Sequence, residues 1–140
     1  MEYDVNNIRE FFKTDAFAAK LGITIDRASD DEVICSMEIT PQHFNAGGAV
    51  QGGAIFTLAD LTFAVHSNLQ LAAGQSDVGM TVGQSCSISF LKSPTGSSMT
   101  ARSACLSRGR NISVFRISVY DEGGTLCAEM FGNGFTKAKR

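Results

Sequence analysis

Two adjacent glycines and one acid form the part of this chain best suited to chemistry. Gly52 and Gly53 stand directly ahead of a long apolar segment, and Asp60 lies within that segment. Glycine lets a ligand approach the backbone closely, and the first amides of a helix have no partner inside the helix. Such amides could bind a developing oxyanion. The neighbours of Asp60 in the sequence are apolar, and a carboxylate in that setting needs a specific role.

The apolar segment predicts the element that must position these groups. Its residues are apolar almost all round a helix, so we expect a central helix from about Gly53 to Ala72. Polar residues interrupt the segment and argue against a membrane span. They are Asp60, His66, Asn68 and Gln70.

Alternating apolar and polar residues predict about six strands around this helix. They cover residues 23–28, 32–40, 85–90, 99–108, 111–120 and 125–136. Residues 6–20 have the spacing of an additional amphipathic helix at the amino terminus. One antiparallel sheet with a single apolar helix implies an α+β fold in which the sheet curls around the helix.

Composition restricts the classes of partner. We expect 140 residues to form one domain, residues 1–140. The formal net charge of −2, from 12 basic and 14 acidic residues, argues against nucleic acid or membrane as a partner. The amino terminus lacks the plan of a secretory signal, which favours a cytoplasmic protein. Four scattered cysteines are expected to be reduced core thiols, with no metal bound: Cys35, Cys86, Cys105 and Cys127.

The loop and helix around the two glycines resemble a known family. The motif residues are His43, Asn45, Gly48, Gln51, Gly52, Gly53 and Asp60. Their spacing is similar to that of hotdog-fold acyl-CoA thioesterases of the phenylacetate-pathway and 4-hydroxybenzoyl-CoA type, which show H-x-N-x-x-G-x-x-H-G-G and an acid seven residues later. The segments SFLKSP and DEGG, at residues 89–94 and 121–124, also resemble that family. Gln51 departs from the pattern, because most relatives carry histidine there.

This resemblance implies a hotdog fold and a reaction. The expected activity is hydrolysis of an acyl-CoA thioester to a carboxylate and CoA, with no cofactor beyond the CoA of the substrate. Similar enzymes are described as dimers with composite sites that often pair again into homotetramers. An isolated monomer is expected to be inactive.

Helix geometry supports a composite site. Gly53 and Asp60 lie about two turns, roughly 10 Å, apart along one helix. A carbonyl carbon held at the Gly53 amide needs an attacking oxygen within about 3 to 3.5 Å. We therefore infer two antiparallel helices, with Gly53 of one subunit facing Asp60 of the other.

The resemblance also assigns roles to single residues. The Gly53 amide would hold the oxyanion, and Asp60 would attack the carbonyl or deprotonate water. Asn45 would orient the substrate or a water, and Gln51 could donate a hydrogen bond to the carbonyl. Hydroxyls that could hold the water or reach the substrate belong to Thr57, Ser67, Thr81 and Ser85.

Structural roles compete with several of these assignments. Asp60 could be a structural acid, and Gly52 and Gly53 could merely permit close packing. Asn45 could cap its own turn, and His43 favours a structural hydrogen bond to its loop. His66 lies on the far side of the helix from Asp60 and is excluded from the site.

Basic residues offer candidates for the phosphates of CoA. Arg108 and Arg110, which flank a tight turn at Gly109, are the best of these; Lys92 and Arg102 are others. The sequence leaves open whether the acyl group is an aryl ring or an aliphatic chain, and whether its carrier is CoA or an acyl carrier protein.

Two other functions compete with hydrolysis. A catalytically weak acyl-CoA binding module is suggested by Gln51 in place of the family histidine. A hydratase or dehydratase ranks last, because neither His43 nor His66 shows the expected pairing with an acid.

Overall fold

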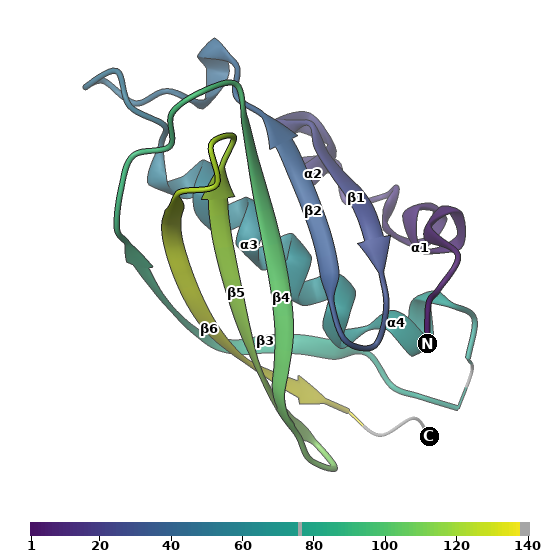
Figure 1. Ribbon diagram of the computed structural model, residues 1–140. Coiled ribbons are helices and arrows are strands. Elements are labelled where there is room, and N and C mark those ends of the chain that lie inside the picture. Colours follow the sequence, from purple (N-terminus) through teal and green to yellow (C-terminus); the bar gives the residue numbers. More distant parts are fainter. Residues whose placement is uncertain (76, 138–140) are drawn as a thin grey trace.

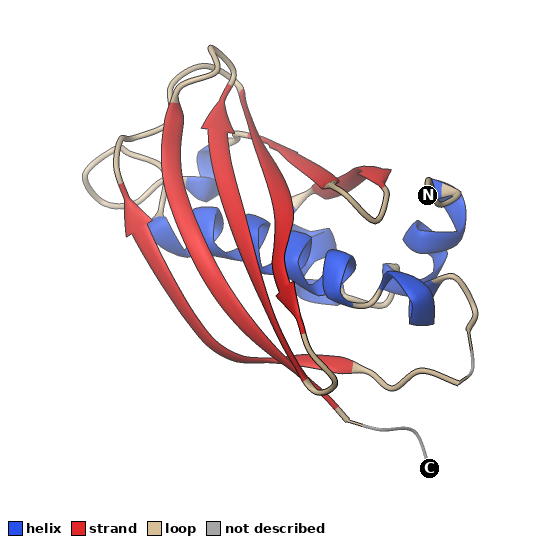
Figure 2. Ribbon diagram, turned by 60° about the horizontal axis from the view of Figure 1, so that its bottom comes forward, coloured by secondary structure: helices blue, strands red, loops and turns tan. Residues whose placement is uncertain are grey.

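A single six-stranded antiparallel sheet wraps around one long helix. The computed structural model describes residues 1–75 and 77–137. The strands are β1 (Ile23–Ala28), β2 (Val33–Glu38), β3 (Thr81–Phe90), β4 (Ser98–Arg108), β5 (Ile112–Asp121) and β6 (Leu126–Thr136). Their order across the sheet is β1-β2-β4-β5-β6-β3, so β1 and β3 form its edges. Helix α3 (Gly52–Ser67) crosses the concave side, as Figures 1 and 2 show. The predicted α+β architecture is confirmed.

Alternation of side chains along each strand makes the concave face apolar. In β5, Phe115, Ile117 and Val119 are fully buried, while Arg116 between them is exposed. A strand turns successive side chains to opposite faces, so this pattern fixes which face meets the helix. The strand therefore contributes one continuous row to the core.

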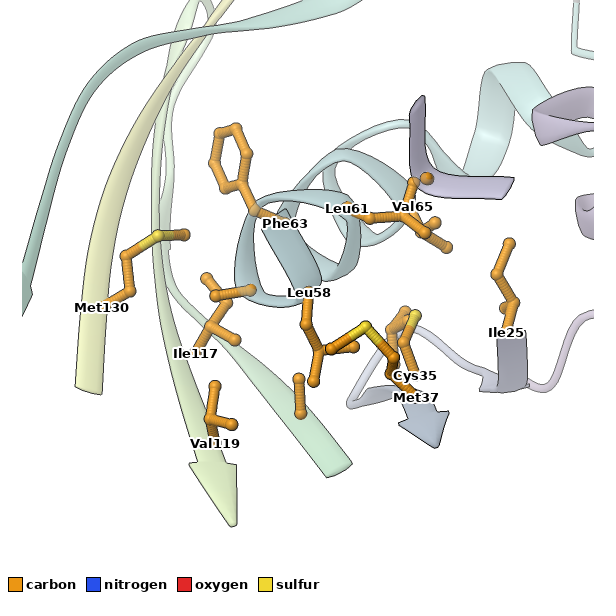
Figure 3. Close-up of a cluster of buried hydrophobic side chains, with 14 of the residues drawn as sticks. Ile25, Cys35, Met37, Leu58, Leu61, Phe63, Val65, Ile117, Val119 and Met130 are labelled. Carbon is orange, nitrogen blue, oxygen red and sulfur yellow. The ribbon is translucent and has the colours of Figure 1, made fainter. Parts of the chain in front are cut away.

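The core forms between this face and α3. Leu58 is fully buried, and Figure 3 shows its side chain among those of Met37, Ile117 and Val119. The Phe63 ring packs edge-on against Phe115, with 5.5 Å between ring centroids.

Glycines in β6 make room for the Phe63 ring. A Cβ atom at Gly132 would lie 3.2 Å from that ring, and one at Gly134 would meet it at the same distance. The glycines of β6 thus serve packing of the central helix.

The amino terminus forms two short helices rather than the one predicted over residues 6–20. They are α1 (Val5–Phe12) and α2 (Ala16–Leu21). The break occurs because Asp15 caps the second helix, its carboxylate accepting a hydrogen bond from the Ala18 amide at 3.1 Å. An N-cap residue cannot keep helical backbone angles, so the apolar spacing continues across an interruption.

The central helix also ends earlier than predicted. It stops at Ser67, and a single turn, α4 (Leu69–Ala72), follows. Asn68 lies between them with φ −121° and ψ 20°. Its carboxamide donates to the carbonyls of Ala64 and Thr81 and accepts from the Thr81 amide. This side chain competes with the helical backbone and ties the helix end to β3.

Two further expectations can be compared with the fold. No helix in the part of the chain that the structure describes is long and apolar enough to cross a membrane. All four cysteines carry free thiols, as predicted. The prediction that all are core residues is wrong for Cys86, which is exposed because it lies on the edge strand β3.

Candidate active site

The loop before α3 is held by His43. Pro41–His43 form one turn of 3-10 helix, and His43 is 1% exposed. Its Nδ1 atom accepts a hydrogen bond from the Thr40 amide at 3.0 Å, so Nε2 carries the proton and donates to the Leu21 carbonyl at 2.9 Å. Both ring nitrogens are used, and the structural role expected for His43 is confirmed.

Asn45 shapes the same loop. Its Oδ1 atom accepts hydrogen bonds from the amides of Gly47 at 2.9 Å and Ala49 at 3.1 Å. Asparagine commonly caps its own turn in this way. The oxygen is thus committed to the loop, and only the exposed amide nitrogen remains to meet a substrate.

The first amides of α3 form a donor site. Gln51 is the N-cap, and its Oε1 atom lies 3.5 Å from the Gly53 nitrogen, at the outer limit of a hydrogen bond. The Gly52 amide has no hydrogen-bond partner among residues 1–75 and 77–137. A sixteen-residue helix places partial positive charge at this end. One unbonded donor, at Gly52, and one weakly bonded donor, at Gly53, therefore point out of the helix, where the sequence predicted free amides.

The two glycines differ in the space around them. A Cβ atom at Gly52 would lie 3.3 Å from the ring of Phe90, at the end of β3. At Gly53 the only atom within 4 Å is the Gln51 Cγ atom, at 3.9 Å. Close packing therefore explains Gly52, whereas within one protomer nothing crowds Gly53.

Asp60 faces outward from the middle of α3, beside the edge strand. Its side chain is exposed in the protomer, yet desolvation by its neighbours raises its pKa, and the negative charge of Asp15 raises it further. The charge of Asp60 in turn contributes to a raised pKa of the Cys86 thiol, whose larger cause is partial desolvation of the sulfur by the atoms around it. An acid with a raised pKa beside a cavity is typical of a functional site.

Asp60 lines a cavity of about 410 Å³. Its apolar walls come from Phe11, Phe12, Phe63, Ala64, Met80 and Val82. Its polar lining comes from Thr14, Asp15, Asp60, Asn68 and Thr81, and Gly83 completes it. The amino-terminal segment is thus part of the lining of the cavity beside Asp60, which sequence reasoning missed. The amphipathic pattern of residues 6–20 indicates only that one face of the helix packs against other residues. Asp15, at the break between α1 and α2, was the one further sign in this segment of a polar site.

The two hydroxyl residues on α3 that the sequence suggested for the site, Thr57 and Ser67, have different surroundings. Thr57 donates its hydroxyl to the Gly53 carbonyl at 2.7 Å. Ser67 donates to the Ala64 carbonyl at 3.3 Å and lines a different cavity from Asp60. Within the protomer, Ser67, which was predicted to share a site with Asp60, therefore lies outside the described lining of the Asp60 cavity. Ser67 ends the helix, where its hydroxyl turns back to the preceding turn.

The two hydroxyl residues on β3, Thr81 and Ser85, also have different surroundings. Thr81 lines the Asp60 cavity, and its hydroxyl lies 2.6 Å from that of Thr136. Ser85 is exposed and lies on the convex face, opposite to its neighbour Cys86, whose sulfur approaches Gly132 on the concave face. Within the protomer, strand alternation therefore turns Ser85, which was predicted to reach the site from the sheet, away from the Asp60 cavity.

A second cavity of about 460 Å³ lies at the carboxyl end of α3. Arg108 and Arg110 line it, and the Arg108 guanidinium stacks over the Phe115 ring at 5.6 Å. Asp30 is the one carboxylate among the described residues of this lining. The two arginines are thus together, as predicted, but at the opposite end of α3 from Gly52.

His66 belongs to the wall of this second cavity. Its Nδ1 atom lies 2.6 Å from the Ser103 hydroxyl, and its Nε2 atom lies 2.9 Å from the Asp30 carbonyl. Burial lowers its pKa. A neutral, fully bonded imidazole is a structural group, which confirms its exclusion from the catalytic site.

The edge strand β3 leaves the site open on one side. Within residues 1–75 and 77–137, β3 pairs only with β6, and residues 82–87 are all exposed. Both ends of this strand lie close to α3. A Cβ atom at Gly83 would lie 3.5 Å from the Phe63 ring, and the Phe90 ring lies 3.3 Å from where a Cβ atom at Gly52 would be. β3 therefore runs antiparallel to α3, and its midpoint lies beside the middle of the helix.

Comparisons with known proteins agree with this architecture. Over 117 residues the chain is 29% identical to the acyl-coenzyme A thioesterase PaaI of Escherichia coli, covering 83% of this chain and 79% of that protein. The solved structure of E. coli PaaI, a protein of the phenylacetic acid degradation operon, superposes with a TM-score of 0.84 at 25% identity, covering 95% of this chain and 92% of that one.

A second solved structure shows the same fold. The thioesterase HI1161 of Haemophilus influenzae superposes with a TM-score of 0.85 at 21% identity, covering 97% of this chain and 92% of that one. Residues 47–128, which include Gly52, Asp60 and strands β3 to β5, match the family described as the Thioesterase superfamily. This protein therefore belongs to the thioesterase superfamily, a family of hotdog-fold thioester hydrolases.

Proposed function

We propose that this protein is an acyl-CoA thioesterase that hydrolyses the thioester to a free carboxylate and CoA. The observation that carries this proposal is the pairing of two features on α3. Weakly engaged amides begin the helix at Gly52 and Gly53, and Asp60 lines a largely apolar cavity on its outward face. Hydrolysis of a thioester needs those parts: a donor for the oxyanion, an acid with an accessible carboxylate and an apolar acyl chamber.

The active unit in this proposal is a dimer formed through β3. An exposed edge strand is a template for pairing with another strand. Antiparallel pairing of β3 with its copy would set two α3 helices side by side and antiparallel, because β3 runs along α3. The amino end of one helix would then lie beside the middle of the other, bringing Gly53 toward the partner subunit's Asp60. A further pairing of two dimers into a homotetramer is also proposed from the family resemblance.

The chemistry then follows from the two helices. The amide of Gly53, assisted by that of Gly52 and by the helix dipole, holds the thioester oxygen as it becomes an oxyanion. Asp60 of the other subunit either attacks the carbonyl carbon or takes a proton from an attacking water. Collapse of the adduct breaks the C–S bond and releases CoA, whose sulfur takes up a proton. If Asp60 is the nucleophile, the acyl group remains on it as an anhydride, which water then hydrolyses to the carboxylate and free Asp60. If Asp60 is the general base, the proton that it took from water passes to the departing sulfur. No metal or cofactor takes part.

Neighbouring side chains have supporting roles in this proposal. The Gln51 carboxamide nitrogen can donate to the carbonyl oxygen, although glutamine cannot titrate. Asn45 can offer only its amide nitrogen, since the oxygen is bonded within the loop. Thr57 lies between the two catalytic regions on α3 and would help to hold the water.

The arginines of the second cavity are proposed to bind CoA. Arg108 and Arg110 carry guanidinium groups suited to phosphate, and their cavity adjoins the Asp60 cavity at Asn68 and Thr81. A pantetheine arm could connect the two positions along the protein surface. An acyl carrier protein would present the same thioester without the nucleotide phosphates.

A substrate panel tests the reaction. Purified protein is incubated with aliphatic and aromatic acyl-CoAs, and free thiol is measured. We expect turnover by the wild type and a loss of about 10²–10⁴-fold in kcat/KM for Asp60→Asn. Equal rates for the two proteins would overturn the catalytic role of Asp60. Tight binding without turnover would identify a binding module instead.

Subunit mixing tests the composite site. Asp60→Asn and Gly53→Val are each expected to be inactive, but a mixed dimer restores one intact site from two damaged chains. Random exchange in an equal mixture should recover about a quarter of wild-type activity. No recovery, when exchange is verified by native mass spectrometry, would contradict a site shared between subunits.

A further inference from the structure

The cavities on either side of the α3 carboxyl end share two lining residues. Asn68 and Thr81 line both the Asp60 cavity and the cavity that holds Arg108 and Arg110. Asn68 is 3% exposed and Thr81 is 5% exposed. Two buried side chains with one cavity on each side form a partition.

Hydrogen bonds fix this partition in place. The Asn68 carboxamide nitrogen donates to the Thr81 carbonyl at 3.0 Å, and its oxygen accepts from the Thr81 amide at 2.7 Å. The Thr81 hydroxyl bonds that of Thr136, 2.6 Å away. On the sheet side, the Thr81 methyl carbon is 2.6 Å from where a Cβ atom at Gly134 would lie. The polar groups of both side chains are hydrogen-bonded, and the Thr81 methyl group is packed against β6. Neither side chain can therefore change rotamer without losing these contacts.

The two cavities differ in chemistry across this partition. Apolar groups dominate the Asp60 side, including the rings of Phe11, Phe12 and Phe63. On the far side the buried Ser113 hydroxyl has no hydrogen-bond partner among the described residues, and the arginines add charge. An alkyl chain that entered from Asp60 would thus meet bonded polar atoms and then a polar space.

We propose that Asn68 and Thr81 form the end wall of the acyl chamber and set the upper limit of acyl length. This inference rests on the proposed thioesterase activity and adds a determinant of specificity to it. Acyl groups that end before the partition fill the Asp60 cavity. Longer chains must displace a bonded asparagine and threonine, which places their carbonyl away from the catalytic groups.

The variants are chosen to change volume and polarity separately. Thr81→Ala removes the methyl and hydroxyl groups and lengthens the Asp60 cavity by the volume that they occupied. Thr81→Val keeps the volume and loses only the hydroxyl, so it is the matched control. Thr81→Ser removes the methyl alone and keeps the bond to Thr136, and it serves if the alanine variant does not fold.

The experiment measures how selectivity depends on acyl length. Straight-chain acyl-CoAs from acetyl to dodecanoyl are compared by kcat/KM for the wild type and the three variants. In an apolar pocket one methylene changes selectivity by about 10–200-fold, so Thr81→Ala should shift the ratio of long to short substrates by at least about tenfold. Thr81→Val should retain the wild-type preference. An unchanged profile in Thr81→Ala and Thr81→Ser would overturn the partition while leaving hydrolysis intact.

The affinity for acyl-CoAs of different chain length is a second measurement, and it does not require turnover. Calorimetric titration of the same acyl-CoAs into Asp60→Asn and Asp60→Asn/Thr81→Ala proteins should show tighter binding of long chains only in the protein that carries Thr81→Ala. If the wild type hydrolyses no acyl-CoA, the proposed function fails, and these titrations still decide whether Thr81 limits chain length. Equal chain-length profiles in the two proteins would count against the partition.

Discussion

Asp15 and Asp60, from different helices, line one cavity, and the charge of Asp15 contributes to the raised pKa of Asp60. Asp15 also caps α2 through the Ala18 amide. Asparagine caps a helix as well as aspartate does, so Asp15→Asn removes the charge and keeps the cap. The pair therefore offers a direct way to change the acidity of the candidate catalytic group without unfolding the segment that covers it.

The pH profile of hydrolysis should respond to that change. The reaction needs ionised Asp60, so kcat/KM should fall as the pH drops through its raised pKa. Asp15→Asn should move this acid limb to lower pH, because it removes the negative charge that helps to raise the pKa of Asp60. A pH–rate series on both proteins measures it, with Asp4→Asn, a cap on α1, as control. An acid limb that does not move would show that Asp15 leaves Asp60 unaffected under turnover.

Asp60→Asn should stabilise the fold at neutral pH while lowering kcat/KM. A carboxylate whose pKa is raised by folding favours the protonated form, so its ionisation weakens the folded state as pH rises through that pKa. Asparagine cannot ionise and avoids this loss. Thermal unfolding of both proteins should show a higher Tm for the variant at pH 7 and no difference at acidic pH. A lower Tm at neutral pH would indicate that Asp60 is a structural acid.

Gly53→Ala should reduce activity without reducing stability. Within the protomer a Cβ atom there meets only the Gln51 side chain at 3.9 Å, and alanine in a helix is about 0.5–1 kcal/mol more favourable than glycine. A methyl group beside the oxyanion donor would displace the substrate, and a misplacement of about 1 Å can cost about 10²-fold. Chemical denaturation and thiol-release assays measure the two effects. Unchanged kcat/KM would place the thioester elsewhere.

The arginines of the β4–β5 turn should affect binding of CoA rather than chemistry. Loss of one charged hydrogen bond costs about 1.5–3 kcal/mol, so Arg110→Gln should raise KM by about tenfold or more and leave kcat nearly unchanged. The same acyl group on pantetheine lacks the nucleotide and should show no such effect. Equal changes for both substrates would exclude a phosphate contact.

Asp121 should stabilise the fold in a pH-dependent manner. Amide donors, the Thr95 amide first and the Thr125 amide next, hold its pKa below the usual range. This stabilisation is present above the pKa of the unfolded chain, about 3.9, and is lost as pH falls through the lower folded value. Asp121→Asn should therefore lower Tm at neutral pH, with little difference in strong acid. Asp77→Asn, at an exposed position, is the control.

Local sequence patterns predicted the elements better than their ends. The alternation that placed a strand at residues 23–28 agrees with β1, and the apolar segment after Gly52 agrees with α3. The interruptions at Asp15 and Asn68 were missed. The side chain of Asp15 begins a helix and that of Asn68 ends one, each through hydrogen bonds to the backbone. The spacing of apolar residues does not depend on such hydrogen bonds and therefore cannot predict these helix ends.

The sequence by itself determined the fold class, the family motif and the positions of Gly52, Gly53 and Asp60 along one helix, because spacing on a helix is fixed by its rise per residue. Tertiary structure decided which distant groups share a cavity. It placed Asp15 and Thr81 in the lining of the Asp60 cavity, placed Ser67 in the lining of the second cavity, and turned Ser85 to the convex face of the sheet. Those placements depend on how helix ends, strand faces and sheet edges pack against one another, which no local pattern of side chains specifies.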